Sequence, residues 1–148
     1  MPAHPIDPRH PPGWYWVVGV LIALWMLVGV AAWCVDLLMT PERLAALPAA
    51  QQQLYAARPA WVFVVYGVAV FAGFAGAIAL LLRRKAAKPL FLLSLFAAVL
   101  QFGHAFGAMD ALALLGPAQA LPLPAMVIAV ALFTVWYARW CARHALLR

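Results

Sequence analysis

The sequence predicts an all-α integral membrane protein, a bundle of four transmembrane helices with a short helical periplasmic cap between the first two. Three observations lead to this fold class. Of the 148 residues, 68% are hydrophobic and 9% are charged, which lies outside the range of water-soluble domains. Four apolar runs are each long enough, as helices, to cross a hydrocarbon core of roughly 30 Å. The basic residues gather at the ends of these runs.

The N-terminal stretch, residues 1–13, is rich in proline, and we expect a short cytoplasmic tail because proline disfavours regular structure. The first helix is predicted over residues 14–38. It opens with three aromatic residues and carries Trp33 near its other end, as expected of amphipathic rings at the two membrane interfaces. The run is too long for the apolar core of a signal peptide, so we expect it to stay in the mature protein.

Residues 39–58 form the predicted periplasmic loop. Thr40 is a typical N-cap, Pro41 suits the first helical position and Glu42 places an acid in the first turn, so a short helix is expected there. A second short helix is expected after Pro48. We expect both to lie on the membrane surface as a cap. The alternative is a merely polar connecting loop.

The second helix is predicted over residues 59–83. One of its faces carries small residues at four-residue spacing, which lets another helix approach closely in lipid. This helix-packing ridge consists of Ala69, Ala72, Gly73, Gly76 and Ala77. The ridge is expected to meet another helix of the same chain, and the alternative is a second subunit.

The third helix is predicted over residues 89–115, where a Gly-Pro pair follows. Ser94, Gln101 and His104 share one of its faces with small residues, because spacings of three and four repeat on a helix. Polar side chains within a membrane usually face the protein interior. We therefore expect this intramembrane polar face to point into the bundle.

The fourth helix is predicted over residues 124–143. It completes a single transmembrane domain, residues 14–144, and residues 145–148 form a cytoplasmic C-terminus. With four spans, both chain ends and the turn between the second and third helices lie on one side. Of the ten Lys and Arg residues, all but Arg43 and Arg58 fall on that side. The positive-inside rule then places both termini in the cytoplasm. In a bacterium the membrane is the inner membrane, and the first loop faces the periplasm.

Candidate chemistry is sparse. The sequence has no Ser/His/Asp triad motif, no Cys-x-x-Cys pair and no phosphate-binding glycine loop. We therefore expect that the protein is not an enzyme and that it has no catalytic residue and no cofactor. His104 is the metal-ligand candidate within the spans, with the outer-interface acids Asp36 and Asp110 as its nearest partners. The favoured alternative is a histidine satisfied by an interhelical hydrogen bond. Cys34 and Cys141 flank different spans and are not expected to form a disulfide.

Several motifs follow one another along the chain. They are Gln51-Gln52 with Leu54-Tyr55, Pro59-Ala60-Trp61, Leu80-Leu81-Leu82-Arg83-Arg84-Lys85, Gln101 with His104, and Val135-Trp136-Tyr137. In these motifs the chain resembles an uncharacterised family of small bacterial four-span inner-membrane proteins, often labelled sugar transporters. The resemblance implies the four-span architecture, and it implies no particular activity or catalytic residue.

Three functions stay open. The favoured one is an accessory or structural subunit that packs against a larger membrane protein or against itself, because the chain is small and lacks catalytic motifs. The second is a homo-oligomeric transporter of small solutes or ions, whose path follows the intramembrane polar face. The third is a protein that binds a lipid, quinone or cofactor near Trp25, Trp33 and Tyr66. The lipid bilayer is a partner in all three, and nucleic acid is not expected because no basic face runs through a soluble domain.

Overall fold

The computed structural model describes residues 11–148, so most of the predicted N-terminal tail lies outside the described residues. Every regular element in the described part is a helix. Those long and apolar enough to cross a membrane are α1 (Gly13–Leu37), α4 (Ala60–Leu81), α5 (Ala87–Gly107) and α8 (Pro122–Arg143), the last together with the short helix before it. The predicted four-helix membrane bundle is confirmed. The chain is a multi-pass membrane protein.

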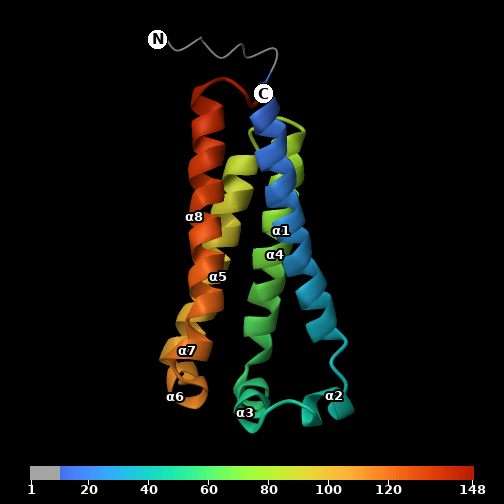
Figure 1. Cartoon of the computed structure of the whole chain (residues 1–148), viewed down its shortest axis with the longest axis vertical. Coiled ribbons are helices and arrows are strands. Elements are labelled where there is room, and N and C mark those ends of the chain that lie inside the picture. The colour runs from blue at the N-terminus through green and yellow to red at the C-terminus, as the bar shows by residue number, and fades with distance from the viewer. Residues whose placement is uncertain (1–10) are drawn as a thin grey trace.

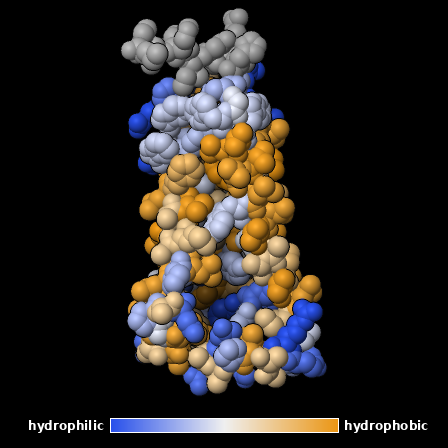
Figure 2. Space-filling view, in the orientation of Figure 1, coloured by the Kyte–Doolittle hydropathy of each residue, from blue (hydrophilic) through white to orange (hydrophobic). Residues whose placement is uncertain are grey.

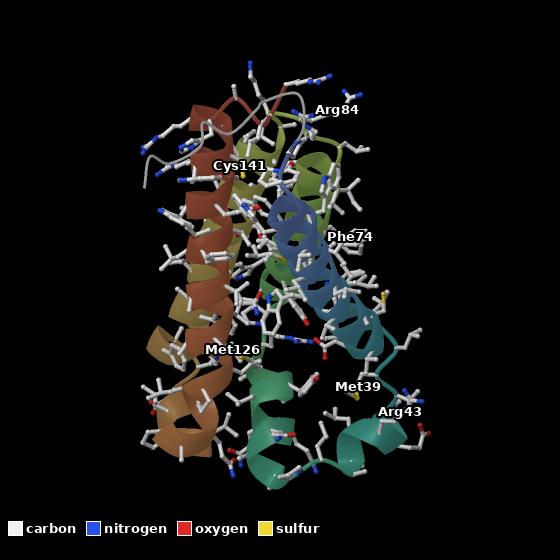
Figure 3. All side chains as sticks on the ribbon, turned by 45° about the horizontal axis from the view of Figure 1, so that its top comes forward. Met39, Arg43, Phe74, Arg84, Met126 and Cys141 are labelled. Carbon is white, nitrogen blue, oxygen red and sulfur yellow. The ribbon has the colours of Figure 1, made fainter. Side chains whose placement is uncertain are left out.

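The long helices pack in the order α1, α4, α5, α8 (Figure 1). The central pair is α4 and α5, with α1 on α4 and α8 on α5. The start of α1, the α4–α5 turn and the end of α8 lie at one end of the bundle, here called the terminal end; the short helices form the loop end. Figure 2 shows an apolar belt between two more polar ends. Arg84 lies at the terminal end and Arg43 at the loop end (Figure 3).

The small-residue ridge of α4 packs inside the chain. A Cβ atom added to Gly73 would lie 2.6 Å from Met26 Sδ of α1 and 2.9 Å from Ser94 Oγ of α5. One added to Gly76 would lie 2.9 Å from Cδ1 of Phe91, also on α5. The alanines of the ridge are buried as well. The ridge therefore packs against helices of the same chain, with α1 and α5 covering it.

Aromatic rings join α1 and α8 at the terminal end. The ring centroids of Trp14 and Trp140 lie 5.3 Å apart, and those of Trp14 and Tyr137 lie 6.3 Å apart. The Tyr137 hydroxyl donates to the backbone carbonyl of Tyr15 at 3.4 Å, and the Tyr15 hydroxyl donates to the carbonyl of Leu80 on α4. Toward the loop end, α1 and α8 separate (Figure 1).

Short helices build the loop end. They are α2 (Pro41–Ala45), α3 (Ala49–Ala57), α6 (Ala111–Leu115) and α7 (Pro117–Ala120). The helical nature of the predicted cap is confirmed by α2 and α3. The Thr40 hydroxyl accepts a hydrogen bond from the backbone N–H of Arg43 at 3.3 Å, and Pro41 occupies the first position of α2. The N-terminus of α2 thus forms as its sequence predicts.

The predicted third helix, residues 89–115, is in fact two helices. α5 ends at Gly107 and α6 begins at Ala111, with Asp110 in the left-handed region between them at φ 51°. Aspartate tolerates this conformation better than most residues because its short polar side chain interacts locally. The break brings α6 into contact with α3. The other three predicted helices agree with the structure to within two residues at each end.

Candidate functional site

A cavity of about 400 Å³, here called the lateral cavity, lies between the long helices in the loop-end half of the bundle. Its walls come from α1, α4, α5 and α8 and are mainly apolar. Val28, which lines it from α1, is 65% exposed, and Leu123, which lines it from α8, is 59% exposed. Because α1 and α8 make few contacts with each other, the cavity opens between them on the surface that faces lipid. Figure 2 shows hydrophilic atoms recessed in this face near the loop end.

A second cavity of about 280 Å³, the loop cavity, lies closer to the short helices. Residues of α3, α6 and α7 line it together with the adjoining ends of α4, α5 and α8. Some residues line both cavities, and we call them the junction. They are Tyr55, Arg58, Tyr66, Gln101, Phe102 and Leu123. The two cavities therefore adjoin.

An ion pair lies at the junction. Arg58 Nη1 donates to Asp36 Oδ2 at 2.6 Å, and the Tyr55 hydroxyl donates to Asp36 Oδ1. The Arg58 guanidinium also lies 4.8 Å from the centroid of the Tyr55 ring and 5.2 Å from that of Phe63. The Asp36 side chain is 8% exposed and that of Arg58 is 25% exposed. Since the two charges offset each other, the junction carries a paired rather than a free cation.

The Tyr55 hydroxyl gives this cluster a pH dependence. Burial, and next its hydrogen bond to Asp36, raise the pKa of Tyr55 from 10.0 to about 12. Because this pKa is higher in the folded than in the unfolded state, the associated stability is fully present below pH about 10 and is lost as the pH rises toward about 12. We expect the free energy of unfolding to fall across that window, less steeply in Tyr55→Phe. Chemical unfolding at stepped pH measures both slopes, and identical slopes would contradict this assignment.

The structure separates one residue of the predicted polar face, His104, from the other two. The Ser94 hydroxyl is buried and donates to the carbonyl of Ala69 at 2.6 Å, so it joins α5 to α4. Gln101 lines both cavities, and its buried Oε1 has no hydrogen-bond partner in the described part of the chain. The His104 ring instead lies edge-on to Trp61, with centroids 4.8 Å apart, and lines neither cavity. Its buried Nδ1 has no hydrogen-bond partner among the described residues, so the expected interhelical hydrogen bond is not formed at this atom. Ser94 and Gln101 therefore line the lateral cavity together, and His104 lies apart from them.

The acids predicted as partners of His104 do not form a metal-binding group with it in the described residues. Asp36 is engaged by Arg58 and Tyr55, and Asp110 is exposed in the α5–α6 connection. Among residues 11–148, no group of three or more His, Cys, Asp or Glu side chains is placed to hold a metal ion. Both cysteines are free: Cys34 is exposed, and Cys141 is buried near the end of α8.

Four junction residues were not identified from the sequence: Tyr55, Arg58, Phe102 and Leu123. Arg58 counted only as a loop charge. The available signal was its position: Asp36 lies near the end of the first span and Arg58 just before the second, so opposite charges flank one loop. Of the residues predicted near an apolar binding site, Trp25 and Tyr66 line the lateral cavity. Trp33 instead stacks on a phenylalanine of α4, at a centroid distance of 5.0 Å.

No protein-family model, curated protein or solved structure matches this chain. The function is therefore inferred from the geometry of the two cavities and their junction.

Proposed function

We propose that the protein binds an amphipathic, lipid-soluble molecule in the lateral cavity, which the molecule reaches sideways from the bilayer between α1 and α8. The supporting observation is an apolar cavity that opens toward lipid and ends at a polar junction with the unpartnered Oε1 of Gln101. Its volume of about 400 Å³ is in the usual range of small-molecule sites. The apolar part of the ligand lies between α1 and α8, and its head group lies at the junction.

The chemistry of the junction favours an uncharged head group that forms hydrogen bonds, such as a hydroxyl, a carbonyl or an amide. Arg58 is already paired with Asp36 at 2.6 Å and packed on aromatic rings. A phosphate would have to displace Asp36 and leave that carboxylate buried without its partner, which is costly. The Gln101 amide offers both an acceptor and a donor to an uncharged group.

We further propose that the protein lies in a bacterial inner membrane with both termini cytoplasmic and the loop end facing the periplasm. The supporting observation is the gathering of basic residues in the α4–α5 turn and at the end of α8. In this orientation the lateral cavity lies in the outer leaflet.

The cavity favours ligand binding over the two other functions expected from the sequence. An accessory subunit would use its small-residue ridge to meet a partner, but α1 and α5 cover that ridge. A transporter path along the predicted polar face would need His104, which lines neither cavity. The family resemblance supports the four-span architecture and does not favour a particular ligand.

Ala32→Trp tests the proposed function. Ala32 is exposed on α1 and lines the lateral cavity, so a large side chain there fills the opening without displacing the core. Its exposed neighbour Ala31 lines neither cavity, which makes Ala31→Trp a matched control. Each protein is purified from its own membrane in mild detergent, and native mass spectrometry identifies the molecules that stay bound.

We expect the parent protein and Ala31→Trp to retain one amphiphile with an uncharged head group per chain. We expect Ala32→Trp to lose most of this ligand. Equal retention by the two variants would contradict the proposal. So would a parent protein that retains no amphiphile.

A further inference from the structure

We infer that the lateral and loop cavities form one passage from the bilayer to the aqueous phase at the loop end. Through this passage the head group of a bound amphiphile is reached from water while its apolar part stays between α1 and α8. The role of the head group rests on the proposed function, whereas the passage itself is a property of the fold and is tested without a ligand.

The first step is the continuity of the two cavities. Junction residues from α3, α4, α5, α8 and the α3–α4 connection line both of them, so the two cavities lie no more than one layer of side chains apart. At its far side the loop cavity is lined by Leu115 of α6 and by Gln119 of α7, which is exposed. The loop cavity therefore ends among the short helices, away from the lipid-facing belt.

The helix break at Asp110 provides the second step. Met109 and Ala111, on either side of the break, both line the loop cavity. A helix that continued straight to Leu115 would carry residues 111–115 onward along the axis of α5, away from α3. The break instead makes α6 one wall of the loop cavity and brings it against α3, which forms another wall.

The third step is the polarity of the junction. Gln101 lies six residues before the end of α5, about 9 Å along the helix, and its Oε1 is buried without a partner in the described residues. A buried amide oxygen without a partner is unfavourable. Water entering through the loop cavity, or the head group of a ligand, supplies the missing hydrogen bond.

Gln101→Cys tests the passage through its reaction with a charged, membrane-impermeant methanethiosulfonate. The variant is made in a Cys34→Ser background, and the background protein supplies the blank for the buried Cys141. Leu100→Cys is the matched control, because Leu100 is the neighbouring residue, is 42% exposed on α5 and lines neither cavity. The proteins are held in phosphatidylcholine nanodiscs. The junction disfavours a phosphate head group, so these lipids leave the junction unoccupied.

We expect Gln101→Cys to be labelled about tenfold faster than Leu100→Cys or more, because reaction requires access of the charged reagent to the thiol. Adding Leu115→Trp, which narrows the opening, is expected to slow the labelling. Adding Leu112→Trp is expected to leave the labelling rate unchanged, because Leu112 is 37% exposed and lines neither cavity. Size-exclusion profiles establish that each variant is folded.

Equally slow labelling at the two positions would overturn the passage. The passage and the proposed function fail separately. If Gln101→Cys is unreactive while the parent protein retains an amphiphile, the passage is wrong and binding stands. If Gln101→Cys reacts but the parent retains nothing, the passage stands and the proposed ligand is wrong.

Discussion

Gly76→Leu is expected to lower the free energy of unfolding by about 3 kcal/mol, the upper part of the range for overpacked cores. A single Cβ added at this position would already lie 2.9 Å from Cδ1 and 3.0 Å from Cε1 of Phe91. The Phe91 ring is fully buried and has no free space to enter, so α4 and α5 must move apart. Unfolding in detergent, followed by tryptophan fluorescence, measures the loss. Such a loss is a large share of the stability of a typical domain.

Gly103→Leu is the matched control on α5. An added Cβ at Gly103 meets no atom within 4 Å, so the new side chain extends into open space. Replacing a helical glycine there is expected to leave stability unchanged or to raise it by up to about 1 kcal/mol. Equal losses for the two substitutions would show that the ridge does not set the distance between α4 and α5.

Asp36→Ala is expected to be the second most damaging change, because it leaves Arg58 without its partner at 2.6 Å and removes the acceptor of the Tyr55 hydroxyl. Breaking a fully buried ion pair costs about 3–5 kcal/mol. The Arg58 side chain is 25% exposed, so water screens part of its charge, and we expect a loss of no more than about 3 kcal/mol. The same unfolding measurement applies.

Two further variants separate the ion pair from a general effect of removing an acid. Glu42→Ala removes an exposed acid of α2 and is expected to leave stability nearly unchanged. Combining Asp36→Leu with Arg58→Leu removes both charges and is expected to cost less than the two single changes added together. An Asp36→Ala protein as stable as Glu42→Ala would show that the ion pair does not hold the end of α1 to the start of α4.

The long helices and the ridge were predictable from sequence because each depends on local information. The length of an apolar run between charged residues fixes where a spanning helix lies, and small residues at four-residue spacing mark a close helix contact whatever the partner. The start of α2 is likewise set locally, by the Thr40 cap and by Pro41 at the first helical position.

The cavities were not predictable in this way. They exist because α1 and α8 meet at the terminal end and separate toward the loop end, and that divergence depends on the packing of all four long helices. The break at Asp110 was missed because apolar residues continue on both sides of it, up to Met109 and again from Ala111 to Leu115. Gln101 was identified as an unusual intramembrane residue, but its unpartnered oxygen and its place at the junction follow only from the fold.

An experimental structure of the protein in nanodiscs of its native lipids tests the central claim most directly. The account predicts non-protein density in the lateral cavity, with its polar end within hydrogen-bond distance of the Gln101 amide and its apolar end between α1 and α8. A structure in which α1 and α8 close against each other along the loop-end half, with Gln101 bonded to a protein atom, would contradict it.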